Sequence, residues 1–417
     1  MECRDLNEVE CLKHKKYCRY TTGKRKYCRK LKNKTKKVSP KMSTSKSPSP
    51  KSPSPKSPSP KSPSPKSLTP KTPTITETDE YIIVKNGNLS KKPHAVFDLD
   101  YTLIKTKSGR KFPKDGDDWV YLYDNTREIL LEMSWTYNII LFTNQKGIRK
   151  AEKRVEFMRK VDQIMKDLGI RMHIYISIQD GYYRKPFTGL WELFVNNKLI
   201  PDKTFYCGDA AGRKEDFAAT DLMFAHNIGI PFYLPEQLFL KQDILVDYEL
   251  PDYLTQYIGT PPKINKPNGE KNMILMCGYP GSGKSSFAKQ FGYLIASNDD
   301  SGTASKCKKL VTNTLKSGIN IVVDNTHSTV KSRKEYYDLG KKYDYHVSIV
   351  YVDNVIQFCY YMNQLRCQLS KGDEELVPKI AYYTMRKRFV VPIGCECDTL
   401  ITVTNKVAEY VYMFPEL

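Results

Sequence analysis

Short apolar segments alternate with longer helical patterns along most of this chain, beginning near Tyr81. Up to about Leu250, the pattern predicts strands at His94–Phe97, Asn138–Phe142, His173–Ile178 and Lys203–Cys207. Between the second and third strands, apolar residues recur at helical spacing, at Ile148, Ala151, Val155, Met158, Val161, Met165 and Leu168. Strands that alternate with helices predict a mostly parallel sheet covered on both faces.

A second alternation of the same kind follows a polar stretch at residues 261–270, which is rich in Pro, Lys and Asn and reads as a linker. It predicts a helix that starts at Ser285–Phe291 and strands at Met273–Cys277, Ile319–Val323 and His346–Val352. The sequence therefore predicts two tandem α/β domains, at residues 79–260 and 271–417.

The first 78 residues differ from the rest in composition. Residues 1–72 contain 21 Lys or Arg and 4 Asp or Glu, so most of the net charge of +21 belongs to an N-terminal arm. Within it, the pentapeptide S-P-S-P-K repeats four times from Ser47 to Lys66 and predicts a disordered linker over residues 39–78. These basic residues could bind nucleic acid through its phosphates, or could form only a soluble spacer. Phosphorylation of the Ser-Pro units would lower their positive charge.

Residues 1–38 form a basic segment with cysteines. Cys11, His14, Cys18 and Cys28 could ligate zinc, or could belong, with Cys3, to a reduced and solvated arm. Because no apolar core of a secretion signal is present, we expect reduced thiols elsewhere too, as at Cys207, Cys307 and Cys359. No apolar run is long enough for a membrane span, so we expect an intracellular protein, either cytoplasmic or nuclear.

Polar residues follow each predicted strand of the first domain. They are Asp98 and Asp100, then Thr143 and Asn144, then Lys185 in a polar stretch, and finally Asp209. Because open α/β sheets bind ligands at the carboxyl ends of their strands, we expect these side chains to form one site.

The order of these residues fits removal of a phosphate through a covalent intermediate. Asp98 would attack phosphorus, and Asp100 would protonate the leaving hydroxyl and later activate water. Asp98, Asp209 and the carbonyl of Asp100 could hold Mg²⁺, which prefers hard oxygen ligands. Lys185 would offset the negative charge, and the Thr143 hydroxyl would donate to a phosphate oxygen. A D-x-D pair alone could equally be a solvated turn, so the prediction depends on the four strand ends together.

The second domain carries G-Y-P-G-S-G-K-S between a predicted strand and a predicted helix. This pattern indicates a loop whose backbone amides cradle the triphosphate of ATP. The expected ATP-binding residues are Gly278, Gly281, Ser282, Gly283, Lys284, Ser285 and Ser286. Lys284 would reach the β- and γ-phosphates, and Ser285 would ligate Mg²⁺.

The acceptor of the phosphoryl group is not fixed by this loop alone. A carboxylate within residues 297–300 could take the proton of an attacking hydroxyl. Arg366 lies in a helical, basic stretch that could close over ATP and stabilise the transferring charge.

Four stretches of the first domain carry a wider resemblance: F-D-L-D-Y-T-L-I-K-T-K-S-G-R-K-F-P, L-F-T-N-Q-K-G-I, Y-R-K-P-F-T-G-L-W and C-G-D-A-A-G-R. They resemble the haloacid-dehalogenase superfamily of phosphatases and, more narrowly, the phosphatase half of eukaryotic polynucleotide kinase 3′-phosphatases. The resemblance covers about residues 92–240. One departure is Tyr101, since the family usually has glycine there; tyrosine could narrow the site or stack on a nucleobase.

The second domain resembles the kinase half of the same enzymes, through G-Y-P-G-S-G-K-S-S-F, an N-x-D after a strand, V-D-N-T and N-Q-L-R. The resemblance implies that the aspartate of N-x-D, here Asp300, is the general base; Asp299 is the alternative register. The family's amino-terminal forkhead-associated β-sandwich is not expected from residues 1–78.

Together the resemblances imply a bifunctional enzyme that removes 3′-phosphates and phosphorylates 5′-hydroxyls with ATP and Mg²⁺, and so prepares strand breaks for ligation in DNA repair. They also imply a monomer. Two alternatives stay open: a small-molecule phosphatase fused to a nucleoside or metabolite kinase, and a nucleic-acid-binding adaptor with one decayed site. The choice between DNA and RNA also stays open.

Overall fold

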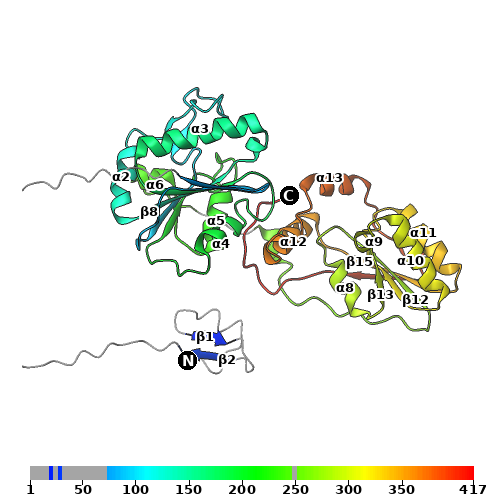
Figure 1. Cartoon of the computed structure of the whole chain (residues 1–417). Helices are drawn as coiled ribbons and strands as arrows, with labels where there is room; N and C mark the ends of the chain where they lie inside the picture. The colour runs from blue at the N-terminus through cyan, green and yellow to red at the C-terminus, as the bar shows by residue number, and fades with distance from the viewer. Residues whose placement is uncertain (1–17, 22–26, 31–72, 247–250) are drawn as a thin grey trace, which may run out of the picture. The chain divides into compact units, whose positions relative to one another are not determined.

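The computed structural model describes residues 18–21, 27–30, 73–246 and 251–417 (Figure 1). The chain divides into two units, Met1–Ser67 and Leu68–Leu417. In the first unit, β1 (Cys18–Thr21) and β2 (Tyr27–Lys30) form an antiparallel pair in which Tyr20 lies opposite Cys28. Of the predicted zinc ligands, Cys11 and His14 lie outside the described residues, as does the predicted linker up to residue 72.

The linker prediction for residues 39–78 is wrong at its C-terminal end. β3 (Thr74–Glu77) pairs antiparallel with β4 (Tyr81–Lys85), so that Ile75 lies opposite Val84. Every side chain of β3 is exposed. The strand is therefore held by backbone hydrogen bonds and by the preference of its β-branched residues for extended chain. A pattern of buried apolar residues does not reveal such a strand.

A seven-stranded sheet forms the centre of the first domain, in the order β11-β10-β5-β8-β9-β4-β3. All neighbouring pairs are parallel except β9 with β4 and β4 with β3. The remaining strands are β5 (His94–Phe97), β8 (Asn138–Asn144), β9 (Met172–Ser177), β10 (Phe205–Cys207) and β11 (Phe232–Tyr233). The four predicted strands are all present, and the mostly parallel sheet is confirmed.

Helices cover both faces of this sheet (Figure 1). One face packs against α2 (Thr126–Thr136), α3 (Ala151–Leu168) and α6 (Pro235–Phe239), and the other against α4 (Gly189–Val195) and α5 (Thr220–Ile228). Successive residues of β5 face opposite ways, since Phe97 joins the first core and Val96 the second. This alternation explains why the strands are apolar throughout.

The predicted apolar face of α3 is partly wrong. Val155 is 67% exposed, whereas Phe157, Val161, Ile164 and Leu168 are buried with the sheet. The buried face is rotated relative to the expected one, and it includes Lys160.

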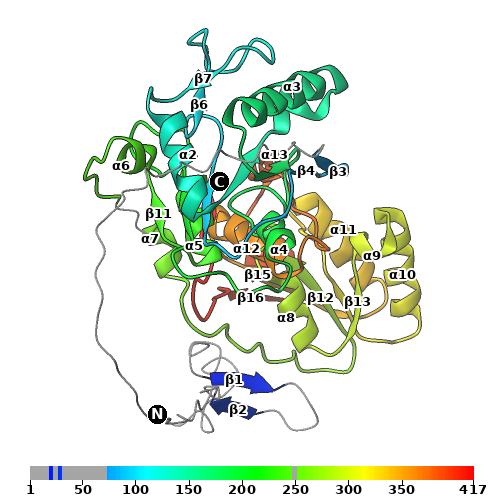
Figure 2. The same ribbon diagram turned by 60° about the vertical axis from the view of Figure 1, so that its left-hand side comes forward.

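A short hairpin of β6 (Ile104–Lys105) and β7 (Val120–Tyr121) lies beside α3 (Figure 2). Its connecting segment contacts that helix: Trp119 Nε1 donates to Gln163 Oε1 over 2.8 Å, and the amide of Gly116 donates to Glu156. The hairpin therefore starts four residues after Asp100 and is anchored on the helix that carries Lys160.

A five-stranded parallel sheet forms the second domain, in the order β13-β14-β12-β15-β16. Its strands are β12 (Asn272–Cys277), β13 (Leu294–Ala296), β14 (Ile321–Val323), β15 (His346–Val352) and β16 (Thr399–Val403). The core on one face includes residues of α10 (Ala304–Lys316) and α11 (Val330–Lys341), and that on the other includes α8 (Lys284–Gln290). The tandem α/β organisation is confirmed.

The second domain contacts the first through α12 (Ile356–Leu369). Gln368 of this helix accepts a hydrogen bond from the Thr188 amide over 3.1 Å and donates one to the Thr188 hydroxyl over 2.6 Å. Phe187 and Phe358 share one apolar cluster around this contact. The other elements within the described residues are η2 (Lys146–Arg149), α7 (Asp252–Thr255), α9 (Asn298–Ser301), α13 (Lys379–Arg388) and η3 (Gly394–Glu396). Within the described ranges, no helix combines the length and the apolar character that crossing a membrane requires.

Candidate active sites

Lys185 lies at the centre of a buried cluster at the carboxyl ends of the first sheet's strands. Its Nζ donates to Asp98 Oδ1 over 2.6 Å, to Asp221 Oδ1 over 2.7 Å and to the Tyr206 hydroxyl over 2.8 Å. Asp98 is 8% exposed and Lys185 is 5% exposed. The predicted pairing of Asp98 with Lys185 is therefore present, in a site largely shielded from solvent.

Asn144, at the end of β8, fixes the backbone of Lys185. Its Oδ1 accepts from the Lys185 amide over 3.0 Å, and its Nδ2 donates to the Lys185 carbonyl over 3.1 Å. One amide side chain thus satisfies both backbone groups of Lys185, and the loop after β9 holds the ammonium over Asp98.

The carboxylates of this cluster are crowded. Burial raises the pKa of Asp209 to about 7, Asp221 adds to the rise, and Lys185 opposes it. Burial also raises the pKa of Asp98, against the attraction of Lys185. For Lys185, burial alone would lower the pKa, but Asp221 and Asp98 raise it above its usual value. The cluster therefore holds more negative charge than one ammonium offsets.

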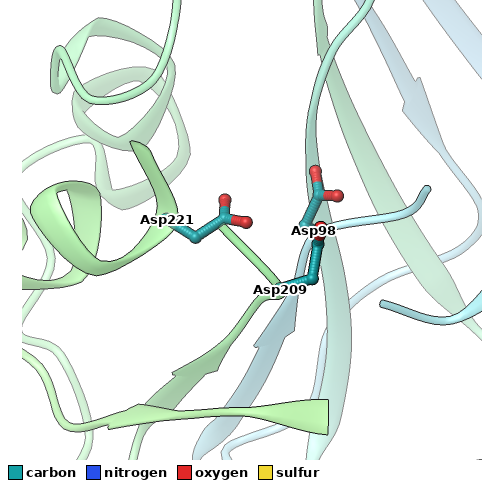
Figure 3. Close-up of side chains that lie close together, drawn as sticks. All are labelled: Asp98, Asp209 and Asp221. Carbon is teal, nitrogen blue, oxygen red and sulfur yellow. The ribbon is translucent and has the colours of Figure 1, made fainter. Parts of the chain in front are cut away.

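Oxygens of Asp98, Asp209 and Asp221 lie within 4.8 Å of one another and could hold a metal ion (Figure 3). Two buried carboxylates and one half-buried carboxylate are hard oxygen donors of the kind Mg²⁺ prefers. Thr102 supports Asp209, because its hydroxyl accepts from the Asp209 amide and donates to Asp209 Oδ1. The sequence predicted Asp98 and Asp209 in this role but did not single out Asp221 or Thr102.

Asp221 reaches the cluster from the start of α5, and its approach depends on Gly208. A Cβ at residue 208 would lie 2.5 Å from the side chain of Asp221. Only glycine therefore leaves room for Asp221 beside β10. An aspartate in the first turn of a helix gives no separate signal in the sequence, since acidic residues are ordinary near a helix N-terminus.

Asp100, two residues after Asp98, is held on both oxygens. Lys160 Nζ lies 3.1 Å from Asp100 Oδ1, and Gln145 Nε2 donates to Asp100 Oδ2. Gln145 also donates to the Thr143 hydroxyl oxygen over 2.9 Å. Because the hydroxyl is the acceptor in this bond, it can still donate its own proton to another group. Lys160 lies on the buried face of α3 and is 2% exposed. The sequence pattern predicted a different buried face for this helix, so it did not identify Lys160 as a site residue.

Tyr101 follows Asp100 with a left-handed backbone, at φ 59°. Its hydroxyl donates to the carbonyl of Lys111 over 2.9 Å, and its side chain is 41% exposed. The tyrosine therefore contacts the segment that follows β6.

The glycine loop of the second domain lies between β12 and α8, as predicted. Gly278, Gly281 and Gly283 all have positive φ. A Cβ at Gly281 would lie 2.2 Å from the Cys359 carbonyl, so the loop packs directly on α12. Lys284 is buried and donates to the Tyr279 carbonyl over 2.7 Å; burial lowers its pKa, and Asp324 opposes that effect.

The rest of the second site is more open. Ser297 caps α9 by accepting from the Asp300 amide over 3.0 Å, and its hydroxyl donates to Asp300 Oδ2 over 2.6 Å. Asp299 and Asp300 are both exposed. Arg366, in the last turn of α12, lies 3.6 Å from Glu374 in a solvated ion pair. Asp300 is thus a helix-capping partner as well as a candidate base. Arg366 belongs to α12, the helix on which the glycine loop packs at Gly281.

Proteins similar to this chain are named as polynucleotide phosphatases and kinases. Residues 93–239 match the model of the family described as polynucleotide kinase 3 phosphatase. A bifunctional polynucleotide phosphatase/kinase of Schizosaccharomyces pombe is 34% identical over 76% of this chain and 80% of its own length. A putative one of Acanthamoeba polyphaga mimivirus is 32% identical over 79% and 89%. A polynucleotide 3′-phosphatase of Saccharomyces cerevisiae is 28% identical over 34% and 85%.

The fold and the two sites define an α/β phosphatase domain followed by an α/β kinase domain with a phosphate-binding glycine loop. More particularly, the chain belongs to the family of bifunctional polynucleotide phosphatase/kinases.

Proposed function

We propose that this protein repairs both ends of a nucleic-acid strand break, with DNA as the main substrate. The first domain removes a 3′-phosphate, and the second transfers the γ-phosphoryl group of ATP to a 5′-hydroxyl. The main support is that one chain contains both the Asp98–Lys185 cluster and the glycine loop with the buried Lys284. Its relatives are named for both activities.

In the phosphatase site, Asp98 attacks phosphorus with its carboxylate while Lys185 holds the other oxygen. The bond from phosphorus to the 3′-oxygen breaks, and Asp100 gives that oxygen a proton. Asp100 then takes a proton from water, which attacks the aspartyl-phosphate. Phosphate leaves and Asp98 is regenerated. Lys160 and Gln145 keep Asp100 in position, and Thr143 donates to a phosphate oxygen.

Asp98, Asp209 and Asp221 fit Mg²⁺, because their oxygens converge and their combined charge exceeds that of Lys185. Bound there, the ion would offset the charge of the phosphoryl oxygens. The carbonyl of Asp100 stays a further candidate ligand.

In the kinase site, the amides of the loop from Gly278 to Ser286 bind the triphosphate, and Lys284 binds its terminal phosphates. Ser285 at the start of α8 supplies an oxygen for Mg²⁺. Asp300 takes the proton of the 5′-hydroxyl, and Arg366 stabilises the charge on the transferring group.

An exposed group of side chains beside the phosphatase site favours a polymeric substrate. The rings of Phe217 and Phe112 are 88% and 73% exposed. Lys111 Nζ lies 4.3 Å from the first ring and 5.9 Å from the second. Exposed rings stack on unpaired bases and lysines attract phosphates, so these groups suit a strand end better than a free nucleotide.

We place the phosphatase domain from β3 to about residue 260, the linker at 261–270 and the kinase domain at 271–417. The enzyme acts as a monomer, since both sites are built from one chain.

A nicked duplex with a 3′-phosphate and a 5′-hydroxyl tests this function. With Mg²⁺ and ATP, the wild-type protein should change both ends, Asp98→Asn only the 5′ end, and Lys284→Ala only the 3′ end. Free 3′-nucleotides and nucleosides should react much more slowly. Faster turnover of the free nucleotides would favour the small-molecule alternative. The same assay with an RNA nick compares the rates on DNA and on RNA.

A further inference from the structure

Tyr101 adopts a backbone conformation that disfavours every residue with a Cβ. Its φ of 59° is left-handed, and it comes directly after Asp100. Glycine would take this conformation without strain, so tyrosine is retained here against a conformational cost. A compensating contribution must come from its side chain.

That side chain contacts the loop at residues 106–114, which joins β6 to the rest of its hairpin. The Tyr101 hydroxyl donates to the Lys111 carbonyl over 2.9 Å. Thr106 donates to the neighbouring carbonyl of Arg110. The middle of the loop is thus tied to the residue next to Asp100.

The two ends of the same loop are fixed separately, by Asp118. Its carboxylate accepts from the amide and hydroxyl of Ser108, both over 2.7 Å, and from the Lys114 amide over 2.8 Å. Asp118 closes the loop into a defined shape, and Tyr101 sets where its tip lies relative to the catalytic carboxylates.

The tip of the loop carries exposed basic and aromatic side chains. Lys111 and Phe112 belong to it, and Lys111 Nζ reaches to 4.3 Å from the exposed ring of Phe217, which follows β10. Loop tip and Phe217 therefore approach one another, and both rings remain open to solvent.

We propose that Tyr101 is a positioning residue that sets specificity for strand ends: its hydroxyl holds the 106–114 loop so that Lys111, Phe112 and Phe217 receive the terminal nucleotides. This assignment rests on the proposed 3′-phosphatase function. It makes Tyr101 important for binding a polynucleotide, and less important for turnover of a small phosphate ester that does not reach the loop tip.

The first test measures the loop itself and does not depend on activity. Hydrogen–deuterium exchange of residues 106–114 is compared in the wild-type protein, Tyr101→Phe and Tyr233→Phe. Tyr233 is a matched control because it is also 41% exposed, on the edge strand β11. Tyr101→Phe should exchange faster in this loop alone, and Tyr233→Phe should not. Unchanged exchange in Tyr101→Phe would overturn the proposal.

The second test separates KM from kcat on two substrates, a 3′-phosphorylated oligonucleotide and p-nitrophenyl phosphate. Loss of one hydrogen bond in Tyr101→Phe should raise KM for the oligonucleotide roughly three- to tenfold. Turnover of the aryl phosphate should fall by a smaller factor. Tyr101→Gly should raise the oligonucleotide KM at least as much.

Two outcomes contradict the proposal. Equal losses on both substrates would mean that Tyr101 acts through Asp100. A normal Tyr101→Phe with an impaired Tyr101→Gly would mean that the ring contacts a base directly. A wild-type protein that hydrolyses only the aryl phosphate would instead defeat the proposed function, and the exchange experiment would still decide the role of Tyr101.

Discussion

At the scale of single residues, the phosphatase site depends on one ammonium shared by three oxygens. Lys185 binds Asp98, Asp221 and the Tyr206 hydroxyl, while Asn144 holds its backbone. A change at Asp221 should therefore alter the hydrogen bond between Lys185 and Asp98, although Asp221 is remote from Asp98 in sequence.

Asp221→Asn keeps the shape of the side chain and removes its charge. We expect 3′-phosphatase activity to fall roughly 10- to 100-fold, because Lys185 loses a fixed partner and the proposed Mg²⁺ site loses a carboxylate. The 5′-kinase activity should not change. Asp202→Asn, an exposed aspartate of the same domain, is the control. Full phosphatase activity in Asp221→Asn would show that Asp221 has no such role.

Mg²⁺ binding should strengthen as the pH rises. The pKa of Asp209 is raised to about 7 in the folded, metal-free protein, chiefly by burial. A raised acid pKa means that the folded state binds the proton more tightly than the unfolded state. The metal-free protein therefore loses stability from the ordinary aspartate range up to about pH 7, and Mg²⁺ must displace that proton.

Thermal unfolding with increasing Mg²⁺ at pH 5.5 and pH 8 measures this linkage. The concentration needed for half of the stabilisation should be lower at pH 8. An equal requirement at both values would contradict the assignment of Asp209 as a ligand.

The residues that the sequence could predict share a position at strand ends. Asp98, Thr143 and Asp209 each follow an apolar strand, and the topology of an open sheet then brings them together. Asp221, Lys160 and Gln145 lie within or before helices, where a charged or amide residue is ordinary. Their roles depend on which helix face is buried, and for α3 the sequence pattern gave a rotated face.

At the scale of elements, the glycine loop is shaped by the helix behind it. Gly281 touches the Cys359 carbonyl and the Asn363 amide of α12, with no room for a side chain. α12 also carries Arg366 in its last turn. The loop and this arginine are therefore positioned by the same helix.

Gly281→Ala should lower 5′-kinase activity by more than about tenfold, because the added methyl group would displace the loop or α12 and φ is positive there. The 3′-phosphatase activity should persist. Gly394→Ala, which has open space around its Cβ position, is the control in the same domain. The measurement is 5′-phosphorylation of an oligonucleotide by labelled ATP; equal rates in the two variants would contradict the packing argument.

The predicted strands are confirmed because buried parallel strands are apolar on both faces, as Val96 and Phe97 show. β3 could not be predicted in the same way, since backbone pairing with β4 holds it while its side chains stay exposed.

At the scale of the whole molecule, the two domains meet close to Lys185. Thr188, three residues further on, is bonded to Gln368 of α12. Phe187 packs against Phe414 with ring centres 5.0 Å apart, and the Asn227 side-chain amide donates to the carbonyls of Pro186 and Met413. The loop that carries Lys185 is therefore braced by the kinase domain.

Gln368→Ala removes two buried hydrogen bonds of Thr188 and leaves the bond from its hydroxyl to Glu192. Loss of such hydrogen bonds costs about 1–3 kcal/mol, so we expect earlier thermal unfolding and weaker 3′-phosphatase activity. Gln357→Ala, a half-buried glutamine of the same helix, is the control. Calorimetry and the phosphatase assay check the prediction, and identical behaviour of the two variants would contradict the proposed brace.

The central claim is that two separate sites on one chain prepare the two ends of a break. Its most direct test is sealing of a nick with 3′-phosphate and 5′-hydroxyl ends by an added DNA ligase, in the presence of ATP and Mg²⁺. The wild-type protein should allow sealing, Asp98→Asn and Lys284→Ala should each prevent it, and a mixture of the two variants should restore it. Sealing with either variant alone, or failure of the mixture when both variants are folded, would contradict the claim.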